Sequence, residues 1–415
     1  MENIIEGIFN KFHSKDLTYY EIPEGETIDS CLKAKALLGL NIKYSNITTE
    51  LMKRFEYEIL VIKNLDFPLY FLIVADIVNY AKKDGIIVGP GRGSVGGSLI
   101  AYALGITDID PIKYDLHFER FINPNYVSLP AISLDCCIEN KAKLFEYIKK
   151  KYGNNPKDQI VKNYKKQIYF QFSYAPHSSN PCLQDQFFSL SFYGSQALTI
   201  ISKTISIIKE NHNKIIDTTN IPLNDTKTFE TFCKGNLSNV FQMKQAEMKS
   251  LIRSIKPAFF DDLMAAIVLF SPTPITLEVD LEFTNRKNGI TPYEYCIPEL
   301  ESILKSTYGL IFYQEQIMQI ASIVAKFPLA ETNYLRKALS HKNFEQIKKM
   351  EVKFIEGAKG NHIPEEKIKI IFEMITNAGV PAFNKSHAVA YALITYQSAY
   401  LKTHYPAEFK VASKI

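Results

Sequence analysis

The sequence lacks the features of a membrane or secreted protein. Its 415 residues contain no run of about 18 uncharged apolar residues, so no membrane-spanning helix is expected. The first residues, MENIIEGIFNKFHSKD, carry acids and lack the basic-then-apolar order of a secretory signal. The six cysteines form no C-x-x-C pair and have no histidine at zinc-ligand spacing. These absences predict reduced core thiols in a cytoplasmic protein.

The chain also lacks a strong charge of either sign. A net charge of +4 permits binding to a polyanion but does not argue for it. The composition, 46% hydrophobic and 22% charged, is that of an ordinary globular protein, and the length suffices for two or three domains. No internal repeat is visible.

Periodicity indicates a mixed α/β front half and an all-helical back half. Apolar residues at helical spacing predict two helices within 49–83, and IIV (86–88) reads as a short buried strand. Further helices are expected at 98–104 and 139–152, and helices follow one another from about residue 218. Residues 152–187 show no lasting period, which predicts a loop or a reduced domain.

A short strand is predicted within SLPAISLDCCIEN, residues 128–140. Its alternation puts Ala131, Ser133 and Asp135 on one face. The opposite face carries Ile132, Leu134 and Cys136 and is expected to pack into the hydrophobic core. The first face is therefore small and polar, and it ends with a single acid.

A glycine loop, VGPGRGSVGGS, lies between the predicted strand 86–88 and the helix that follows. Gly91, Gly93 and Gly96 match the dinucleotide fingerprint, but the acid that should end a second strand is missing, and no Walker lysine follows. Glycine amides, a helix N-terminus and the Arg92 guanidinium would still make an anion cradle. This pattern favours phosphate binding over a plain turn.

Three long blocks carry a resemblance to one family. FPLYFLIVADIVNYAKKDGIIVGPGRGSVGGSLIAYALGITDIDPIKYDLHFERFINPNYVSLP is followed in order by STYGLIFYQEQIMQIASIVAKFPLAETNYLRKAL and FNKSHAVAYALITYQSAYLKTHYPAEF. They resemble the palm and fingers of bacterial DNA polymerase III alpha subunits, the C-family DNA polymerases. The resemblance implies an α+β fold, in which a polymerase-beta-like nucleotidyltransferase palm with a mixed sheet precedes a mainly α-helical fingers domain. It implies an N-terminal leader at 1–50, a palm at 51–215 with a reduced thumb-like region at 140–187, and helical fingers at 216–415.

The resemblance also assigns the catalytic positions. The family reads Met-Pro-Asp-x-Asp-x-Asp, whose last two aspartates hold Mg²⁺ and fall here at Ser133 and Asp135, with Ala131 in the earlier acidic slot. The third aspartate, in a Lys-x-Asp-Phe-Leu-Gly stretch, falls at Ser191. Only Asp135 keeps a metal-binding carboxylate, so weak or single-metal Mg²⁺ binding is expected. Asp185 lies too far along the chain to substitute, and solvated or structural roles are expected for Glu119 and Glu139.

Much of the nucleotide site matches the family. The residues expected to meet the incoming triphosphate are Gly91, Arg92, Gly93, Ser94, Arg336, Lys337, Asn384, Lys385, Ser386 and His387. Without the resemblance, Arg336 and Lys337 would read as a solvated helix face, and His387 as a helix-start residue. Other positions depart from the family pattern: Ser271 replaces an arginine, and Ser340, His341 and Lys342 replace Gly-Lys-Lys.

Two functions follow as hypotheses. The first is a DNA-directed DNA polymerase that extends a primer on a DNA template with dNTPs and Mg²⁺. The second is a pseudoenzyme, an inactive paralogue that binds nucleotide, DNA or a replication protein as its partner. The missing acids favour the second, because serine cannot hold the metals. A decaying gene product with no selected role is a third possibility.

Overall fold

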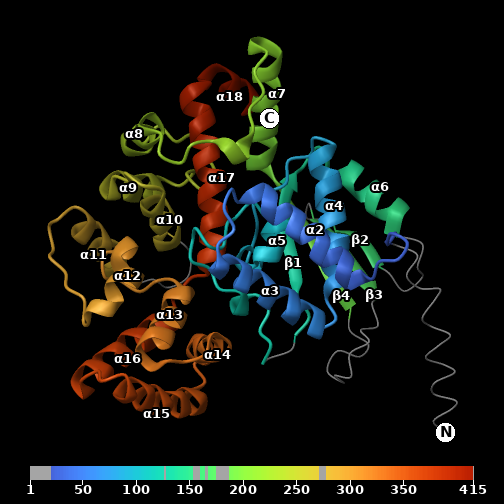
Figure 1. Cartoon of the computed structure of the whole chain (residues 1–415). Helices are drawn as coiled ribbons and strands as arrows, with labels where there is room; N and C mark the ends of the chain where they lie inside the picture. The colour runs from blue at the N-terminus through green and yellow to red at the C-terminus, as the bar shows by residue number, and fades with distance from the viewer. Residues whose placement is uncertain are drawn as a thin grey trace, which may run out of the picture.

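The computed structural model describes residues 20–125, 128–152, 159–163, 167–173, 187–270 and 277–414. The front half combines helices with one sheet, and the described back half consists of helices (Figure 1). The predicted mixed α+β architecture is therefore confirmed. The front helices are α2 (Ile28–Lys43), α3 (Thr49–Asn64), α4 (Pro68–Lys83), α5 (Leu99–Ala103), α6 (Lys141–Tyr152) and α7 (Gln196–His212).

The sheet has four strands in the order β1-β4-β3-β2. Its strands are β1 (Ala131–Cys137), β2 (Gln159–Asn163), β3 (Gln167–Ser173) and β4 (Phe187–Ser195). β1 and β4 are parallel, while β4 with β3 and β3 with β2 are antiparallel. The parallel pair forms one edge of the sheet and carries the positions that the resemblance singles out.

The sequence interpretation missed two of these strands. Residues 152–187 were expected to be a loop or reduced domain, but β2 and β3 lie within them and extend the sheet. Ile168 and Phe170 are buried at alternate positions of β3, which is the pattern of a half-buried strand. Strands this short give a weak signal when polar residues surround them.

The strand predicted at 86–88 is reduced to a single bridge. Val88 pairs with Cys136 of β1, the Cys137 amide donates to the Ile87 carbonyl at 2.9 Å, and the Gly89 amide donates to the Asp135 carbonyl at 2.8 Å. Pro90 follows and has no amide to continue the ladder. The chain instead turns into the glycine loop, which is thereby held against the end of β1.

Part of the segment expected to be a leader packs into the front core. Cys31, Leu32, Ala36 and Leu40 of α2 are buried in the same hydrophobic cluster as α3, α4 and the sheet. The domain boundaries expected from the sequence stay predictions.

The described residues of the back half belong to three further hydrophobic clusters, two of which also include residues of the front half. Its main helices are α8 (Thr226–Lys234), α9 (Ala246–Ile255), α10 (Phe260–Leu269), α11 (Leu277–Lys287), α13 (Gln314–Ala325), α14 (Leu329–Ser340), α15 (Phe344–Gly360), α16 (Glu365–Gly379), α17 (Lys385–His404) and α18 (Pro406–Ala412). α17 is buried around most of its circumference and packs against α7, α8 and α10, as expected of a helix at the centre of a core. Its first turn reaches the glycine loop of the front half (Figure 1).

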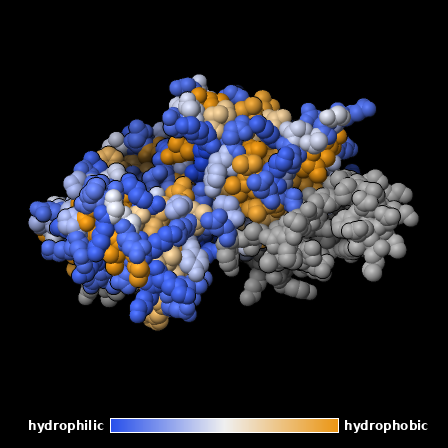
Figure 2. Space-filling model, turned by 60° about the horizontal axis from the view of Figure 1, so that its bottom comes forward, coloured by the Kyte–Doolittle hydropathy of each residue, from blue (hydrophilic) through white to orange (hydrophobic). Residues whose placement is uncertain are grey.

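The surface of the described residues mixes polar and apolar side chains. Figure 2 shows hydrophobic patches scattered among hydrophilic ones on the visible face. None of the described helices is both long and apolar enough to span a bilayer.

A buried tyrosine fixes the start of the β1–β4 pair. The Tyr70 hydroxyl, on α4, donates to the Ser189 carbonyl and accepts from the Ile132 amide, both at 2.8 Å. Its ring stacks on Phe188 with centroids 4.9 Å apart. One hydroxyl therefore satisfies a backbone group on each of the two strands.

Tyr70→Phe should destabilise the protein by about 1–3 kcal/mol, because two buried backbone groups lose their partner while the ring packing stays. Urea unfolding followed by circular dichroism measures the change. Tyr80→Phe on the same helix is the matched control, since that side chain is only half-buried, and it should stay within about 0.5 kcal/mol of the parent. Equal effects of the two variants would contradict the bridging role.

Candidate functional site

The parallel strands bring the predicted catalytic positions side by side. Ser133 of β1 lies opposite Ser191 of β4, and Asp135 lies opposite Tyr193. Ala131 lies opposite Ser189 in the same register. Since residues two apart on a strand share a face, these positions form one continuous patch. Among them, Asp135 alone carries a carboxylate.

Asp135 is buried and paired with an arginine. Its side chain is only 8% exposed, and its Oδ1 accepts from Arg92 Nη1 at 3.0 Å. Oδ2 is buried and has no hydrogen-bond partner among the described residues. Burial raises the pKa of Asp135 above its ordinary value, and the Arg92 charge opposes this increase.

Arg92 joins three parts of the molecule. The Arg92 side chain extends from the glycine loop and pairs with Asp135 of β1. Its guanidinium lies 4.4 Å from the ring centre of Tyr193 on β4. The same Nη1 donates to the Tyr391 hydroxyl of α17 at 3.1 Å. A cation over an aromatic face and a charge-assisted hydrogen bond both favour this placement. The sequence interpretation found Arg92 but missed both tyrosines.

The glycine loop owes its path to two of its glycines. Gly93 has a φ of +69°, which a residue with a side chain rarely adopts. A Cβ on Gly96 would lie 2.5 Å from the Ser386 hydroxyl oxygen, so only glycine allows the loop to approach α17 this closely. The loop and the start of α17 therefore form one surface.

One part of the predicted anion cradle is wrong. The N-terminus of α5, expected to face a phosphate, is already occupied by the buried carboxylate of Glu58. Glu58 accepts from the Leu99 amide at 3.0 Å, from the Ile100 amide at 3.2 Å and from the Ser98 hydroxyl at 2.8 Å. Arg54 neutralises it at 2.6 Å. A second anion has no place at this helix end, so any phosphate must meet Arg92 and the loop itself.

The first turn of α17 contacts the loop directly. Asn384 caps the helix by accepting from the His387 amide at 3.2 Å, and His387 Nδ1 accepts from the Gly93 amide at 3.0 Å. Burial, with a smaller contribution from the Arg92 charge, lowers the pKa of His387 to about 4. His387 is therefore neutral at pH 7, with Nδ1 free of a proton. Ser386 is buried, and its hydroxyl has no hydrogen-bond partner among the described residues.

Arg336 and Lys337 lie on α14, in a second group of cations. Arg336 is only 5% exposed and donates to the Asn333 side chain at 2.5 Å and 3.1 Å. Burial and the charge of nearby Arg120 lower the pKa of Arg336 to about 9. Burial and Arg336 likewise lower the pKa of Lys337. The reading of this pair as a solvated helix face is wrong for Arg336.

One acid connects this group with α17. Glu315 is buried at the start of α13, and its Oε2 accepts from the Lys385 amide at 2.8 Å. Its charge also opposes the lowered pKa values of Arg120 and Arg336. Arg120 donates to the neighbouring Gln314 side chain at 2.9 Å. Neither Glu315 nor Arg120 was singled out from the sequence, because both look like ordinary surface charges there.

The other predicted positions have partners that fit structural roles. Glu119 is buried, and burial raises its pKa, which fits the structural role rather than the solvated one. Glu139 is partly exposed and pairs with Lys203 of α7. The Ser340 hydroxyl donates to the Gly379 carbonyl at 3.1 Å. Asp185 and Ser271 lie outside the described residues.

A pair of magnesium ions does not fit the residues of this face. Magnesium selects hard oxygen ligands and usually at least one or two carboxylates. Ser133 and Ser191 are neutral, and the single carboxylate of Asp135 already holds a guanidinium. Within the described ranges, no group of three or more histidine, cysteine, aspartate or glutamate side chains could hold a metal.

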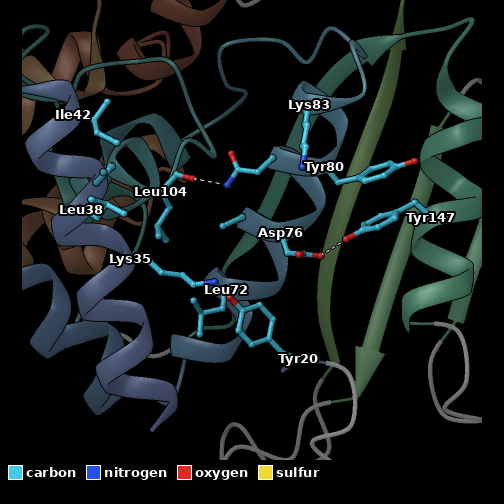
Figure 3. A pocket seen from close by; sticks show the side chains of 14 residues that line it. Tyr20, Lys35, Leu38, Ile42, Leu72, Asp76, Tyr80, Lys83, Leu104 and Tyr147 are labelled. Atoms are coloured by element: carbon cyan, nitrogen blue, oxygen red, sulfur yellow. Dashed lines mark hydrogen bonds between the residues drawn. The ribbon is translucent and has the colours of Figure 1, made fainter. Parts of the chain in front are cut away.

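The structure also contains a cavity of about 500 Å³ away from these residues. Side chains of α2 and α4 line it together with Tyr20 and Tyr147 of α6, and Tyr147 donates to Asp76 at 2.6 Å (Figure 3). None of the site residues predicted from the sequence lines it.

Comparison with known proteins identifies the family. Residues 30–167 match the model of the bacterial DNA polymerase III alpha NTPase domain, and residues 197–362 match that of the bacterial DNA polymerase III alpha subunit finger domain. The chain is 32% identical to the DNA polymerase III subunit alpha of Aquifex aeolicus over 95% of its own length and 44% of the relative's. Identity to the Campylobacter jejuni subunit is 34% over 88% of the chain and 38% of the relative.

The chain thus spans less than half the length of these curated relatives. The predicted resemblance is confirmed across both halves of the chain, including the glycine loop and α14. This protein therefore belongs to the family of bacterial DNA polymerase III alpha subunits.

Proposed function

We propose that this chain is a nucleotide-binding member of the replicative polymerase family that does not carry out nucleotidyl transfer. The observation that carries the proposal is the pairing of Asp135 with Arg92, on a face whose other catalytic positions are serines. Its β1–β4 face would be the remnant of a nucleotidyltransferase palm, and the helices from α8 onward would be its fingers. Its ligands would be dNTPs and primer-template DNA, with replication proteins as further partners.

The proposed loss of nucleotidyl transfer follows from the lack of negative charge at the metal-binding positions. Template-directed transfer uses two divalent metals about 4 Å apart to activate the primer hydroxyl and to steady the leaving pyrophosphate. Serine hydroxyls supply neither negative charge nor strong ligation, and a guanidinium 3.0 Å from the remaining carboxylate repels a dication. The described residues therefore favour Asp135 as the counter-ion of Arg92 over Asp135 as a metal ligand.

Nucleotide binding is supported by the surplus of buried positive charge. Burial lowers the pKa of both Arg120 and Arg336, and the Arg120 charge lowers that of Arg336 further. Among the described residues, the charge of Glu315 opposes both shifts. Two like charges out of water are costly unless an anion compensates them. A triphosphate at the junction of α14 and α17 would supply that anion.

Template-directed polymerisation stays as a second candidate. It is favoured by the register that sets Ser133 opposite Ser191, because the positions that the resemblance assigns to catalysis lie side by side. The two candidates differ in turnover, not in the ligands that they bind.

Primer extension separates them. With primed template, all four dNTPs and Mg²⁺ or Mn²⁺, the protein should show no extension above that of its Asp135→Ala variant, because no metal pair forms. Denaturing gel electrophoresis of a labelled primer measures this. Extension that disappears in Asp135→Ala would establish the polymerase instead.

Restoring the acids should create a metal site. Ser133→Asp and Ser191→Asp together would place two new carboxylates on the same face as Asp135. Mn²⁺ titration followed by electron paramagnetic resonance should then show a saturable site that the parent lacks. A parent protein that binds Mn²⁺ and loses it in Asp135→Ala would contradict the proposed pairing with Arg92.

The contact between α17 and the loop should depend on pH. The pKa of His387 is about 4 in the folded protein and about 6.5 when unfolded, so its neutral form stabilises the fold above pH 6.5, and this contribution fades as the pH falls toward 4. Between pH 7 and 5 the parent should lose roughly 1–2 kcal/mol more stability than His387→Gln. Denaturant unfolding at both pH values measures the difference, and parallel losses would contradict it.

A further inference from the structure

Three contacts fix the guanidinium of Arg92 beside the face of β1 and β4 that carries Asp135. It lies 3.0 Å from Asp135 Oδ1, 3.1 Å from the Tyr391 hydroxyl and 4.4 Å from the centre of the Tyr193 ring. Contacts from β1, β4 and α17 thus converge on one charged group.

Tyr193 is the aromatic part of this arrangement. The register sets it directly beside Asp135, and its ring centre lies 4.4 Å from the Arg92 guanidinium. An aromatic ring attracts a cation through its face, which an aliphatic side chain cannot do. Tyr193 therefore helps to hold Arg92 in place.

We propose that this site binds the triphosphate of a nucleotide without a divalent metal, and that the Arg92 guanidinium supplies the positive charge that a metal provides elsewhere. Tyr193 acts as the positioning residue that keeps the guanidinium at the sheet. The inference rests on the proposed nucleotide binding and names its ligand as the metal-free triphosphate.

The chemistry of Arg92 suits this ligand. Both hydrogen bonds that it makes to described residues use Nη1, and 29% of its side chain is exposed, so Nε and Nη2 remain as donors for phosphate oxygens. Mg²⁺ cancels part of the negative charge of a triphosphate and would itself be repelled by Arg92. A site whose phosphate donor is a guanidinium therefore favours the uncomplexed form.

Asp135 sets the strength of this binding. Its carboxylate competes with an incoming phosphate for the same guanidinium, since both are anions that accept from Arg92. Removing the carboxylate charge should therefore strengthen phosphate binding, whereas removing Arg92 should weaken it. Damage to the fold would not produce opposite effects at two partners of one ion pair.

Isothermal titration calorimetry with dATP, and with inorganic tripolyphosphate as a base-free probe, tests the inference in EDTA and in excess Mg²⁺. The Kd should be several-fold lower in EDTA than in Mg²⁺. In EDTA, Arg92→Ala should weaken binding by about 10-fold or more, and Asp135→Asn should strengthen it several-fold.

Tyr193→Leu should weaken binding of the probes, while Tyr193→Phe, which keeps the ring, should not. Arg253→Ala, at an exposed position of α9, is the matched control.

The outcomes separate this inference from the proposed function. Binding that is tightened 10-fold or more by Mg²⁺ would overturn the metal-free inference but leave nucleotide binding standing. Weaker binding in Asp135→Asn, or equal binding in Tyr193→Leu and the parent, would also overturn it. If circular dichroism shows a folded protein that binds neither probe in either buffer, nucleotide binding itself fails.

Discussion

The ion pair between Arg92 and Asp135 is the interaction on which the site depends. It ties the glycine loop to the end of β1, and through Tyr193 and Tyr391 it extends to β4 and α17. Removing one member of a buried pair leaves an uncompensated charge and typically costs about 3–5 kcal/mol, somewhat less where one partner is partly exposed as Arg92 is. The pair also limits the chemistry that we propose, because the one carboxylate among the paired positions of β1 and β4 is already neutralised by a side chain.

Two groups of buried charged side chains, one around Glu58 and one around Arg336, differ in how far positive and negative charges cancel. Arg54 and Glu58 neutralise each other, and the Glu58 carboxylate is surrounded by the amides and hydroxyl at the start of α5. This group is complete and serves the fold. Around Arg120 and Arg336, by contrast, positive charge exceeds negative charge, and both guanidinium pKa values are lowered. An incomplete balance of this kind in a buried place is what a site for an anionic ligand requires.

The sequence predicted the secondary-structure architecture better than it predicted the contacts between side chains. Alternation in β1 put Asp135 on a polar face. The register sets Ser191 opposite Ser133, and the assignment of Ser191 to the third catalytic position stays a prediction. Long amphipathic helices such as α15 and α16 followed from their periodicity alone. β2 and β3 were missed because a strand of five to seven residues among polar neighbours has too few alternations to stand out.

The sequence could not reveal which charges meet in space. Glu58 and the start of α5 are about forty residues apart, and nothing local marks that carboxylate as the cap that fills the expected anion site. Tyr391 is almost three hundred residues from Arg92. Tyr193 was missed as well, because its role depends on the guanidinium that the fold brings over its ring.

The most direct test of the account is a crystal structure of the protein grown with Mn²⁺ and dATP, with anomalous diffraction data to locate the metal. The account predicts Arg92 within hydrogen-bonding distance of either Asp135 or a phosphate oxygen, and no anomalous peak at the Asp135 carboxylate. A manganese ion bound to Asp135, with Arg92 displaced from the sheet, would contradict it.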